Sequence, residues 1–99
     1  IFYCGFALEF EEGYAAIVKD KSSVGAAGVQ TSAGVFDAGY RGEYNAQLIN
    51  LSGEPFEIKK GQKIAQVIIF PVAIAKLVEV SELADSARGE GKLGSTGKF

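Results

Sequence analysis

Four short stretches of this sequence carry side chains that could bind or cleave a phosphate-bearing substrate. The first is Lys19-Asp20-Lys21-Ser22-Ser23, where charged and hydroxyl side chains lie at a possible helix start. Free backbone N–H groups and hydroxyls at such a place can bind an anion. The alternative is an ordinary polar turn with a serine cap, which this stretch taken alone favours.

The second stretch, residues 34–43, reads Gly-Val-Phe-Asp-Ala-Gly-Tyr-Arg-Gly-Glu. Its Asp37 stands between an apolar residue and a glycine-flanked tyrosine, where a carboxylate could act as a general base on water. The glycines allow close backbone approach or a positive φ. The alternative is a β-turn in which Asp37 is the turn former and Tyr40 belongs to the core.

The third stretch places a polar side chain in an apolar run, and the fourth is a glycine-rich, positively charged tail. Gln66 lies in an apolar run within residues 61–66, where an amide needs hydrogen-bond partners, so it is either a ligand-binding group or a satisfied buried glutamine. Residues 88–98 combine glycines and hydroxyls with a local charge of +2, from Arg88, Lys92 and Lys98 against Glu90. That composition suits phosphate oxygens, although a disordered linker is the alternative. It is not a Walker loop, because Lys92 and Phe99 stand at two positions that the motif reserves for other residues.

The elements that would position these groups are mostly strands. Ninety-nine residues with 47% hydrophobic and 22% charged side chains indicate one globular domain. Alternating or β-branched apolar patterns predict strands, and the tight turns between them predict an all-β sandwich or jelly roll. The predicted strands span residues 6–10, 14–18, 43–51, 56–58, 64–70 and 72–80, and the strand at 64–70 is expected to be buried on both faces. Residues 29–36 are small and mixed, with Gly34 among them. We expect a short helical turn over 22–27 ended by Gly28, a hairpin turn at 59–62, and an irregular tail after residue 81.

Composition also excludes several classes of function. The net charge of −2 argues against nucleic acid as a partner. The sequence contains no apolar run of 18 residues, so it predicts no membrane-spanning helix. The chain has no histidine, so serine triads and histidine-ligated metals are excluded within one chain. The single Cys4 allows no internal disulfide, which fits a cytoplasmic location. Because the sequence has no Met and opens at Ile1, we expect the domain to be incomplete at its N-terminus.

Taken together and in order, the four stretches resemble motifs two to five of the trimeric dUTPase family. Residues 20–23 are similar to the second motif, 34–43 to the third, 61–66 to the fourth and 88–97 to the fifth. The resemblance implies a jelly-roll or distorted β-barrel core over residues 1–80, a glycine-rich C-terminal arm over 81–99, and a homotrimer with active sites at subunit interfaces. It implies hydrolysis of dUTP to dUMP and pyrophosphate, which limits uracil incorporation into DNA and supplies dUMP for thymidylate synthesis.

The resemblance also implies a role for individual residues. Asp37 falls on the water-activating carboxylate, Thr31 and Gly34 on the hairpin that reads uracil, and Tyr40 under the deoxyribose. The phosphate-binding positions are Lys21, Ser22, Ser23, Gln66, Arg88, Gly94, Ser95 and Thr96. The cofactor is Mg²⁺, held through substrate phosphates and water, with no direct protein ligand in this chain.

Three departures from the family pattern stand out. Lys21 replaces the usual arginine of the second motif, so charge is kept but bidentate recognition is lost. Leu93 occupies the uracil-capping position, where the family usually has a stacking phenylalanine. The first motif and its carboxylate are absent from the sequence.

Two other functions compete with dUTP hydrolysis. A dCTP deaminase shares the resemblance in fold, but its catalytic glutamate would fall on Gln47, which cannot serve as that base. The missing first motif motivates the other alternative, a non-catalytic nucleotide-binding relative.

Overall fold

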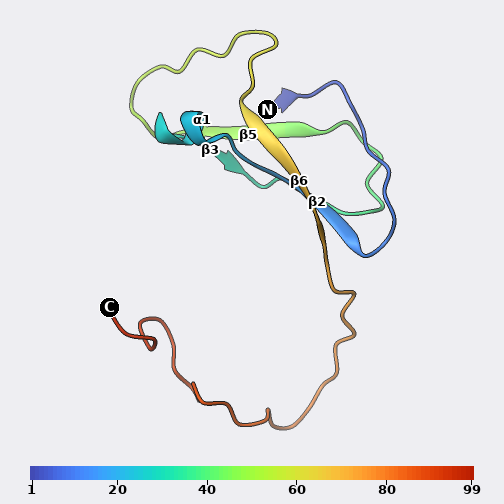
Figure 1. Cartoon of the computed structure of the whole chain (residues 1–99), viewed down its shortest axis with the longest axis vertical. Coiled ribbons are helices and arrows are strands. Elements are labelled where there is room, and N and C mark those ends of the chain that lie inside the picture. The colour runs from blue at the N-terminus through green and yellow to red at the C-terminus, as the bar shows by residue number, and fades with distance from the viewer.

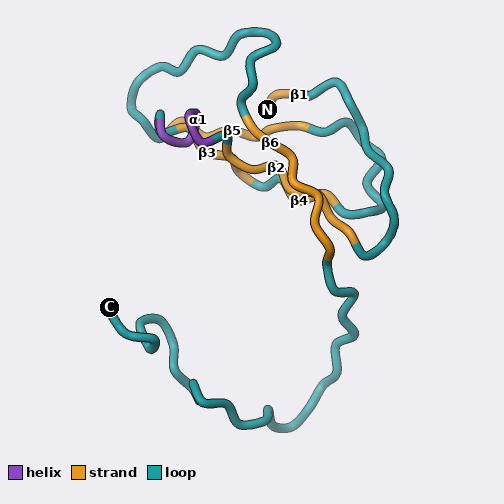
Figure 2. The backbone as a smooth tube through the Cα atoms, viewed as in Figure 1, coloured by secondary structure: helices purple, strands orange, loops and turns teal.

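The computed structural model describes residues 1–99 as two three-stranded antiparallel sheets and one short helix (Figure 1). One sheet has the strand order β1-β5-β3 and the other β4-β2-β6. Most of the remaining chain is irregular, and it forms long connections around the sheets (Figure 2). The elements are β1 (Phe2–Tyr3), β2 (Tyr14–Asp20), α1 (Ser22–Ala26), β3 (Val29–Ser32), β4 (Val35–Phe36), β5 (Asn45–Asn50) and β6 (Ala65–Pro71).

Strand β2 is the centre of its sheet and the most buried strand of the molecule. It pairs with β6 along its whole length, from Tyr14 opposite Pro71 to Asp20 opposite Ala65. Its other edge pairs with the two residues of β4. Small and β-branched side chains fit the pleated surface of such a central strand, and Ala16 and Val18 are buried there.

The core between the two sheets is small and largely aromatic. Ala16, Val18, Phe36, Tyr44 and Ala46 form one buried cluster. The rings of Phe36 and Tyr44 stack with centroids 4.3 Å apart, and Tyr44 is fully buried. Offset stacking of this kind adds directional packing to the burial of apolar area, so it fixes β4 against the start of β5.

The predicted helical turn forms directly after β2. Helix α1 has Lys21 at its N-cap and Ala27 at its C-cap, and Gly28 follows with a φ of +85°. A Cβ on Gly28 would lie 2.9 Å from the Cβ of Ser52, so both the conformation and the space require glycine. Gly28 thereby turns the chain tightly into β3.

Three predicted strands are wrong, and in each case a strand partner is lacking. Residues 6–10 are irregular, although the Phe6 carbonyl accepts one bond from the Tyr44 amide at 2.9 Å. The bond from Val72 N–H to the Gly13 carbonyl follows the last residue pair of β2 and β6, and residues 72–80 have no strand beyond it. Residues 56–58 precede a turn closed by the Gln62 N–H bond to the Lys59 carbonyl at 3.0 Å, but no hairpin forms.

The prediction that the strand at 64–70 is buried on both faces is also wrong. Strand β6 forms at Ala65–Pro71, but it lies at the edge of its sheet, so β2 covers only one of its sides. Ile68 and Ile69 are 44% and 51% exposed. A β-branched run therefore predicted the strand correctly, but it could not tell which neighbour covers it.

Candidate functional site

The polar stretch after β2 presents two exposed hydroxyls and one cation. Ser22 and Ser23 open α1 and are exposed. The Lys21 Nζ donates to the Ser23 Oγ at 2.6 Å, which holds the ammonium beside the hydroxyls. A single cation with adjacent hydroxyls can bind phosphate oxygens, so this stretch has the donors that its predicted role requires.

Asp20 joins this stretch to two other elements. One carboxylate oxygen, Oδ1, accepts from the Thr31 backbone N–H at 2.7 Å and from the Thr31 hydroxyl at 2.6 Å. Its carbonyl accepts from the Gln66 Nε2 at 2.8 Å. The hydrogen bonds from Thr31 hold the pKa of the Asp20 carboxyl below its ordinary value of 3.8, and Lys19 lowers it further. Two of the sequence-predicted residues, Thr31 and Gln66, are thereby held at Asp20, which Lys21 follows in the chain.

Gln66 is not the buried amide that one interpretation of the sequence expected. It is exposed on β6, opposite Lys19 in the sheet register. Its side chain is nevertheless satisfied, since it donates to Asp20 across the end of the sheet. The position of its side chain at the end of β2 is therefore set by a hydrogen bond and not by burial.

The corner between β3 and β4 is shaped by two residues with positive φ. Ala33 has a φ of +54° and Gly34 a φ of +91°. The Gly34 carbonyl accepts from the Val18 N–H at 2.8 Å, and a Cβ on Gly34 would lie 2.9 Å from the Val18 carbonyl oxygen. Gly34 is thus required for the close approach of this corner to β2.

Asp37 lies on an exposed turn that follows β4. Its Oδ1 accepts from the Gly39 N–H at 2.9 Å, so Asp37 is a turn former as one interpretation predicted. Asp37 also lines a shallow hollow of about 320 Å³ with Glu12, Gly13 and Ile74. One carboxylate oxygen is therefore fixed by the turn, and the other has no hydrogen-bond partner within the chain.

Tyr40 closes the same turn by packing against the core. Its ring meets Phe36 edge-on at a centroid distance of 4.9 Å, and its hydroxyl donates to the Glu43 carbonyl at 3.0 Å. A Cβ on Gly42 would lie 2.6 Å from the Tyr40 hydroxyl oxygen, so the packed ring depends on that glycine. The Tyr40 ring is half-buried and lies next to Asp37 in the turn.

The two groups of predicted site residues lie at opposite ends of β2. The register of β2 and β4 pairs Ala16 with Phe36, which brings Asp37 level with Ala15. Asp20 is five residues further along β2, a separation of about 16 Å at the usual rise of a strand. One chain therefore does not bring Asp37 into contact with the hydroxyls of α1.

The C-terminal arm lies apart from both groups. After β6 the chain turns away from the sheets (Figure 1), and every residue from 81 to 99 is exposed. Arg88 folds the arm onto itself, since its Nε donates to the Ser95 Oγ at 2.8 Å and its Nη2 to the Lys92 carbonyl at 3.0 Å. Leu93 is fully exposed, and the glycine-rich stretch that includes Gly94 and Thr96 contacts no sheet.

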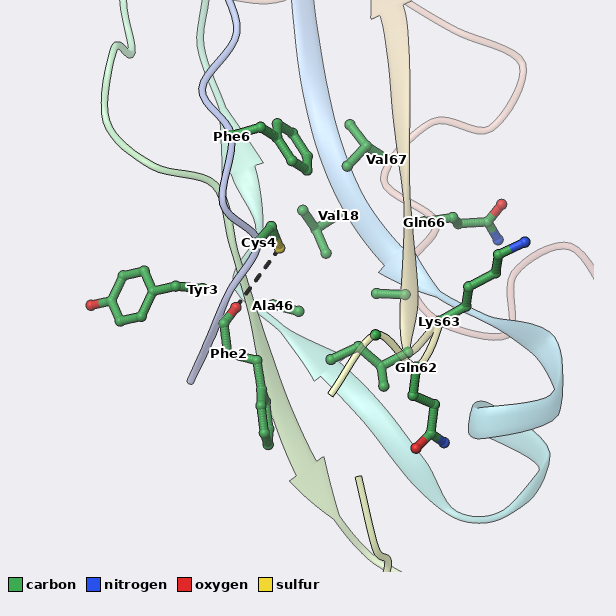
Figure 3. A pocket seen from close by; sticks show the side chains of 13 residues that line it. Phe2, Tyr3, Cys4, Phe6, Val18, Ala46, Gln62, Lys63, Gln66 and Val67 are labelled. Carbon is green, nitrogen blue, oxygen red and sulfur yellow. Dashed lines mark hydrogen bonds between the residues drawn. The ribbon is translucent and has the colours of Figure 1, made fainter. Parts of the chain in front are cut away.

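The most apolar cavity lies elsewhere, between β1, β5 and β6. It has a volume of about 320 Å³ and includes Cys4, Val18 and Ala46 in its lining (Figure 3). The Gln66 and Lys63 side chains extend to the other side of β6 from these residues (Figure 3). Gln66 still belongs to the lining of the cavity, but none of the other phosphate-binding candidates does.

The structure contains no built metal centre. No group of three or more His, Cys, Asp or Glu side chains is arranged to hold an ion.

The longest helix has five residues, and no helix has the length and hydropathy that crossing a bilayer requires.

Sequence reasoning missed Asp20 and Tyr44 as individual residues of interest. Asp20 lies between two lysines at a strand end, and that isolated acid was the available signal. Tyr44 carries a fully buried hydroxyl without a hydrogen-bond partner. Burial, with Tyr40 and Asp37 nearby, raises the pKa of Tyr44 above 10.0, and no sequence signal distinguishes such a hydroxyl from a satisfied one.

Comparison with known proteins gives one consistent family. A family model described as dUTPase matches residues 1–97. The deoxyuridine 5'-triphosphate nucleotidohydrolase of Nautilia profundicola is 45% identical over 97 residues, which cover 95% of this chain and 68% of that protein. The protein of the same name from Beijerinckia indica is 45% identical over 96 residues, which cover 94% of this chain and 60% of that protein. The chain thus spans about two thirds or less of the length of these relatives.

Solved structures give the same fold. A mutant dUTPase of Staphylococcus bacteriophage 80alpha with dUpNHpp matches with a TM-score of 0.80 at 28% identity, over 93% of this chain and 72% of that one. The native EIAV dUTPase matches with a TM-score of 0.72 at 25% identity, and the match covers 80% of this chain and 66% of that one. A mutant dUTPase of phage phi11 matches with a TM-score of 0.67 at 24% identity, and the match covers 80% of this chain and 69% of that one. That structure is described by its coordination of a structural Mg(II) ion. The predicted all-β, jelly-roll type of subunit is confirmed.

Proposed function

The chain belongs to the dUTPase family, and from that premise we propose that it hydrolyses dUTP to dUMP and pyrophosphate. The observation that carries the proposal is the family match over residues 1–97, which includes Asp37 and nearly all of the four polar stretches. Its expected physiological effects are a limit on uracil incorporation into DNA and a supply of dUMP for thymidylate synthesis. A cytoplasmic location rests on the single free Cys4 alone.

Asp37 is the proposed general base. The products require cleavage of the bridge between the α- and β-phosphates, with water as the nucleophile. The Asp37 Oδ1 is held by Gly39, so the second oxygen can orient that water and take its proton. With no histidine in the chain, a carboxylate is the base that this sequence can offer at neutral pH.

The proposed phosphate-binding groups lie around α1 and in the arm. Ser22 and Ser23 offer exposed hydroxyls, and Lys21 adds a cation beside them. Gln66 is fixed nearby through Asp20. The arm residues Arg88, Gly94, Ser95 and Thr96 would close over the far phosphate, with Leu93 at the position that covers the base. Closure of the arm would exclude water from the reacting centre.

The proposed nucleoside-binding groups lie at the β3–β4 corner and the following turn. The backbone of residues 31–34 offers both N–H donors and carbonyl acceptors, the two kinds of group that a uracil ring requires. The packed face of Tyr40 would lie under the deoxyribose and leave no room for a 2′-hydroxyl. The Thr31 hydroxyl itself is engaged with Asp20, so its contribution is to hold the strand.

A homotrimer with shared active sites is part of the proposal. Asp37 and the hydroxyls of α1 are separated by most of the length of β2, so a single chain presents an incomplete site. Ile68 and Ile69 are exposed on the edge strand β6, and Leu77 and Val78 are exposed on the irregular segment that follows it. Exposed apolar surface of this extent is typical of an interface between chains.

Magnesium would act on the substrate and not on the protein. Mg²⁺ keeps several waters and binds phosphate oxygens readily, so the triphosphate of dUTP can supply its ligands. When bound, it would neutralise charge on the phosphates. The phosphate-binding residues named above would then hold the loaded substrate.

Pyrophosphate release from dUTP, dCTP, dTTP and UTP tests the proposed function. We expect release from dUTP and little from the other three, since the corner selects the base and Tyr40 the sugar. Ammonia release from dCTP would instead support a dCTP deaminase, against which Gln47 argues. Binding of a dUTP analogue without any turnover would support a non-catalytic nucleotide-binding protein.

A further inference from the structure

We infer that Asp20 is a positioning residue for dUTP hydrolysis, because it fixes the phosphate-binding stretch of α1 relative to the strand that leads to the base-reading corner. This inference rests on the proposed function. It assigns no contact between Asp20 and the substrate.

The first support is that Asp20 joins the two sheets. It ends β2, whereas Thr31 belongs to β3, an edge strand of the other sheet. The backbone N–H and the hydroxyl of Thr31 both donate to the Asp20 Oδ1, at 2.7 and 2.6 Å. Hydrogen bonds to a charged acceptor are stronger than neutral ones, so this contact holds the edge of β3 against the end of β2.

The second support is that Asp20 also contacts β6 and α1, the two elements of the sheet region that carry phosphate-binding residues. Its carbonyl fixes the Gln66 amide at 2.8 Å. A Cβ built on Gly25 would lie 3.6 Å from the Asp20 Cβ and 3.8 Å from Oδ2, so the carboxylate also lies against α1. Lys21 follows Asp20 directly in the chain. Asp20 thus contacts α1, β3 and β6, the first two through its side chain.

The third support is the division of roles that this geometry creates. Asp37 lies at the other end of β2 from Asp20, and no hydrogen bond joins their immediate surroundings. Loss of the Asp20 carboxylate should therefore disturb substrate binding more than the chemical step. A small displacement of groups that hold a substrate can cost up to about 100-fold in rate or affinity.

Steady-state kinetics of Asp20→Ala, Asp20→Asn and Thr31→Val test the inference, with Glu57→Ala as the control. Glu57 is an exposed carboxylate in the irregular segment between β5 and β6 and makes no hydrogen bond. For Asp20→Ala we expect the KM for dUTP to rise by about 10- to 100-fold, with a smaller change in kcat. Asp20→Asn keeps an oxygen that can accept from Thr31, so it should restore most of the loss. Thr31→Val should show a smaller rise, and Glu57→Ala none.

A binding measurement separates positioning from a general loss of structure. Isothermal titration would compare dUMP with dUpNHpp, at a temperature at which circular dichroism shows each variant folded. We expect Asp20→Ala to narrow the affinity difference between the two ligands, because only dUpNHpp reaches the phosphate-binding stretch with a full triphosphate. If Asp20→Ala does not fold, Thr31→Val provides the same comparison, with a smaller expected change.

Unchanged KM values and an unchanged affinity difference in folded Asp20→Ala and Thr31→Val would overturn the inference and leave the proposed function intact. A parent chain that neither hydrolyses dUTP nor binds dUpNHpp would instead overturn the proposed function, and the positioning role with it. An equal rise in KM for Glu57→Ala would show a nonspecific charge effect and would also overturn the inference.

Discussion

Two aspartates at opposite ends of one strand show how the surroundings of a carboxylate decide what it can do. Asp20 accepts two hydrogen bonds from Thr31 on a single oxygen and lies against α1. Asp37 accepts one bond from Gly39 and lines an open hollow. The first arrangement suits a structural anchor, and the second leaves an oxygen available for water.

The first prediction concerns the pH dependence of the Asp20 contact. Because hydrogen bonds lower the pKa of Asp20 in the folded chain, its stabilisation is fully present above the unfolded value of about 4 and is lost as the pH falls through the lower folded value. Urea unfolding of the parent and Asp20→Asn should therefore give a constant stability difference from pH 7 to about pH 5, which shrinks in stronger acid. A difference that grows in acid would contradict this account.

The second prediction concerns the buried hydroxyl of Tyr44. A buried hydroxyl without a partner costs about 1–3 kcal/mol, whereas the stacking with Phe36 needs only the ring. Tyr44→Phe should therefore leave the free energy of unfolding unchanged or raise it by about 1 kcal/mol. Tyr40→Phe is the matched control, since it removes the hydrogen bond to Glu43 and should not stabilise the chain. A marked loss of stability in Tyr44→Phe would show that the hydroxyl has a partner.

At the scale of elements, strands could be predicted where the chain itself supplies the partner. Alternation and β-branching predicted the strands now seen as β2, β5 and β6, and serines followed by glycine predicted α1. Residues 6–10 and 72–80 have equally apolar patterns, but no neighbouring strand pairs with them. Strand propensity depends on that context, so the pattern alone could not separate the two cases.

The candidate site could be predicted only in part for a related reason. The sequence indicated the turn at Asp37 and the polar start of α1, because turn formers and caps act locally. It could not indicate that Asp20 bonds to Thr31 eleven residues later or that Gln66 donates to Asp20, since the register of the strands sets those contacts. The roles of these residues in catalysis stay predictions.

The third prediction tests the corner between β3 and β4. Gly34→Ala combines a left-handed backbone with a clash against the Val18 carbonyl, so it should lower the free energy of unfolding by about 2–4 kcal/mol. Gly53→Ala is a matched control with a φ of +79° and no atom within 4 Å, and should cost only about 1–2 kcal/mol. Equal losses in thermal unfolding would show that the close approach to β2 is unimportant.

At the scale of the whole molecule, the chain is thin, and most of its side chains are exposed to solvent. Its principal extents are 53 × 38 × 18 Å, and eight of its 99 residues are buried. A chain of this size normally buries more of its apolar side chains, so the exposed faces of β6 and the segment after it fit the proposed association between copies of the chain. The separation of the two residue groups along β2 fits the same proposal, in which each site is shared between copies of the chain.

The fourth prediction is therefore a trimer in solution. Light scattering should give three times the chain mass of 10.4 kDa, because association covers β6 and completes each site. Ile69→Lys, which places a charge on the exposed face of β6, should reduce that mass, whereas a lysine at exposed Leu83 in the arm is the control. A single-chain mass for the parent would contradict the shared site.

Pyrophosphate release from dUTP by the parent chain and by Asp37→Asn tests the central claim most directly. The asparagine keeps the acceptor for Gly39 but cannot take a proton from water, so the fold and the binding of dUpNHpp should survive. We predict that the parent releases pyrophosphate and dUMP in equal amounts and that kcat falls at least about 100-fold in the variant. Equal turnover by the two proteins, or no pyrophosphate release by the parent, would contradict the account.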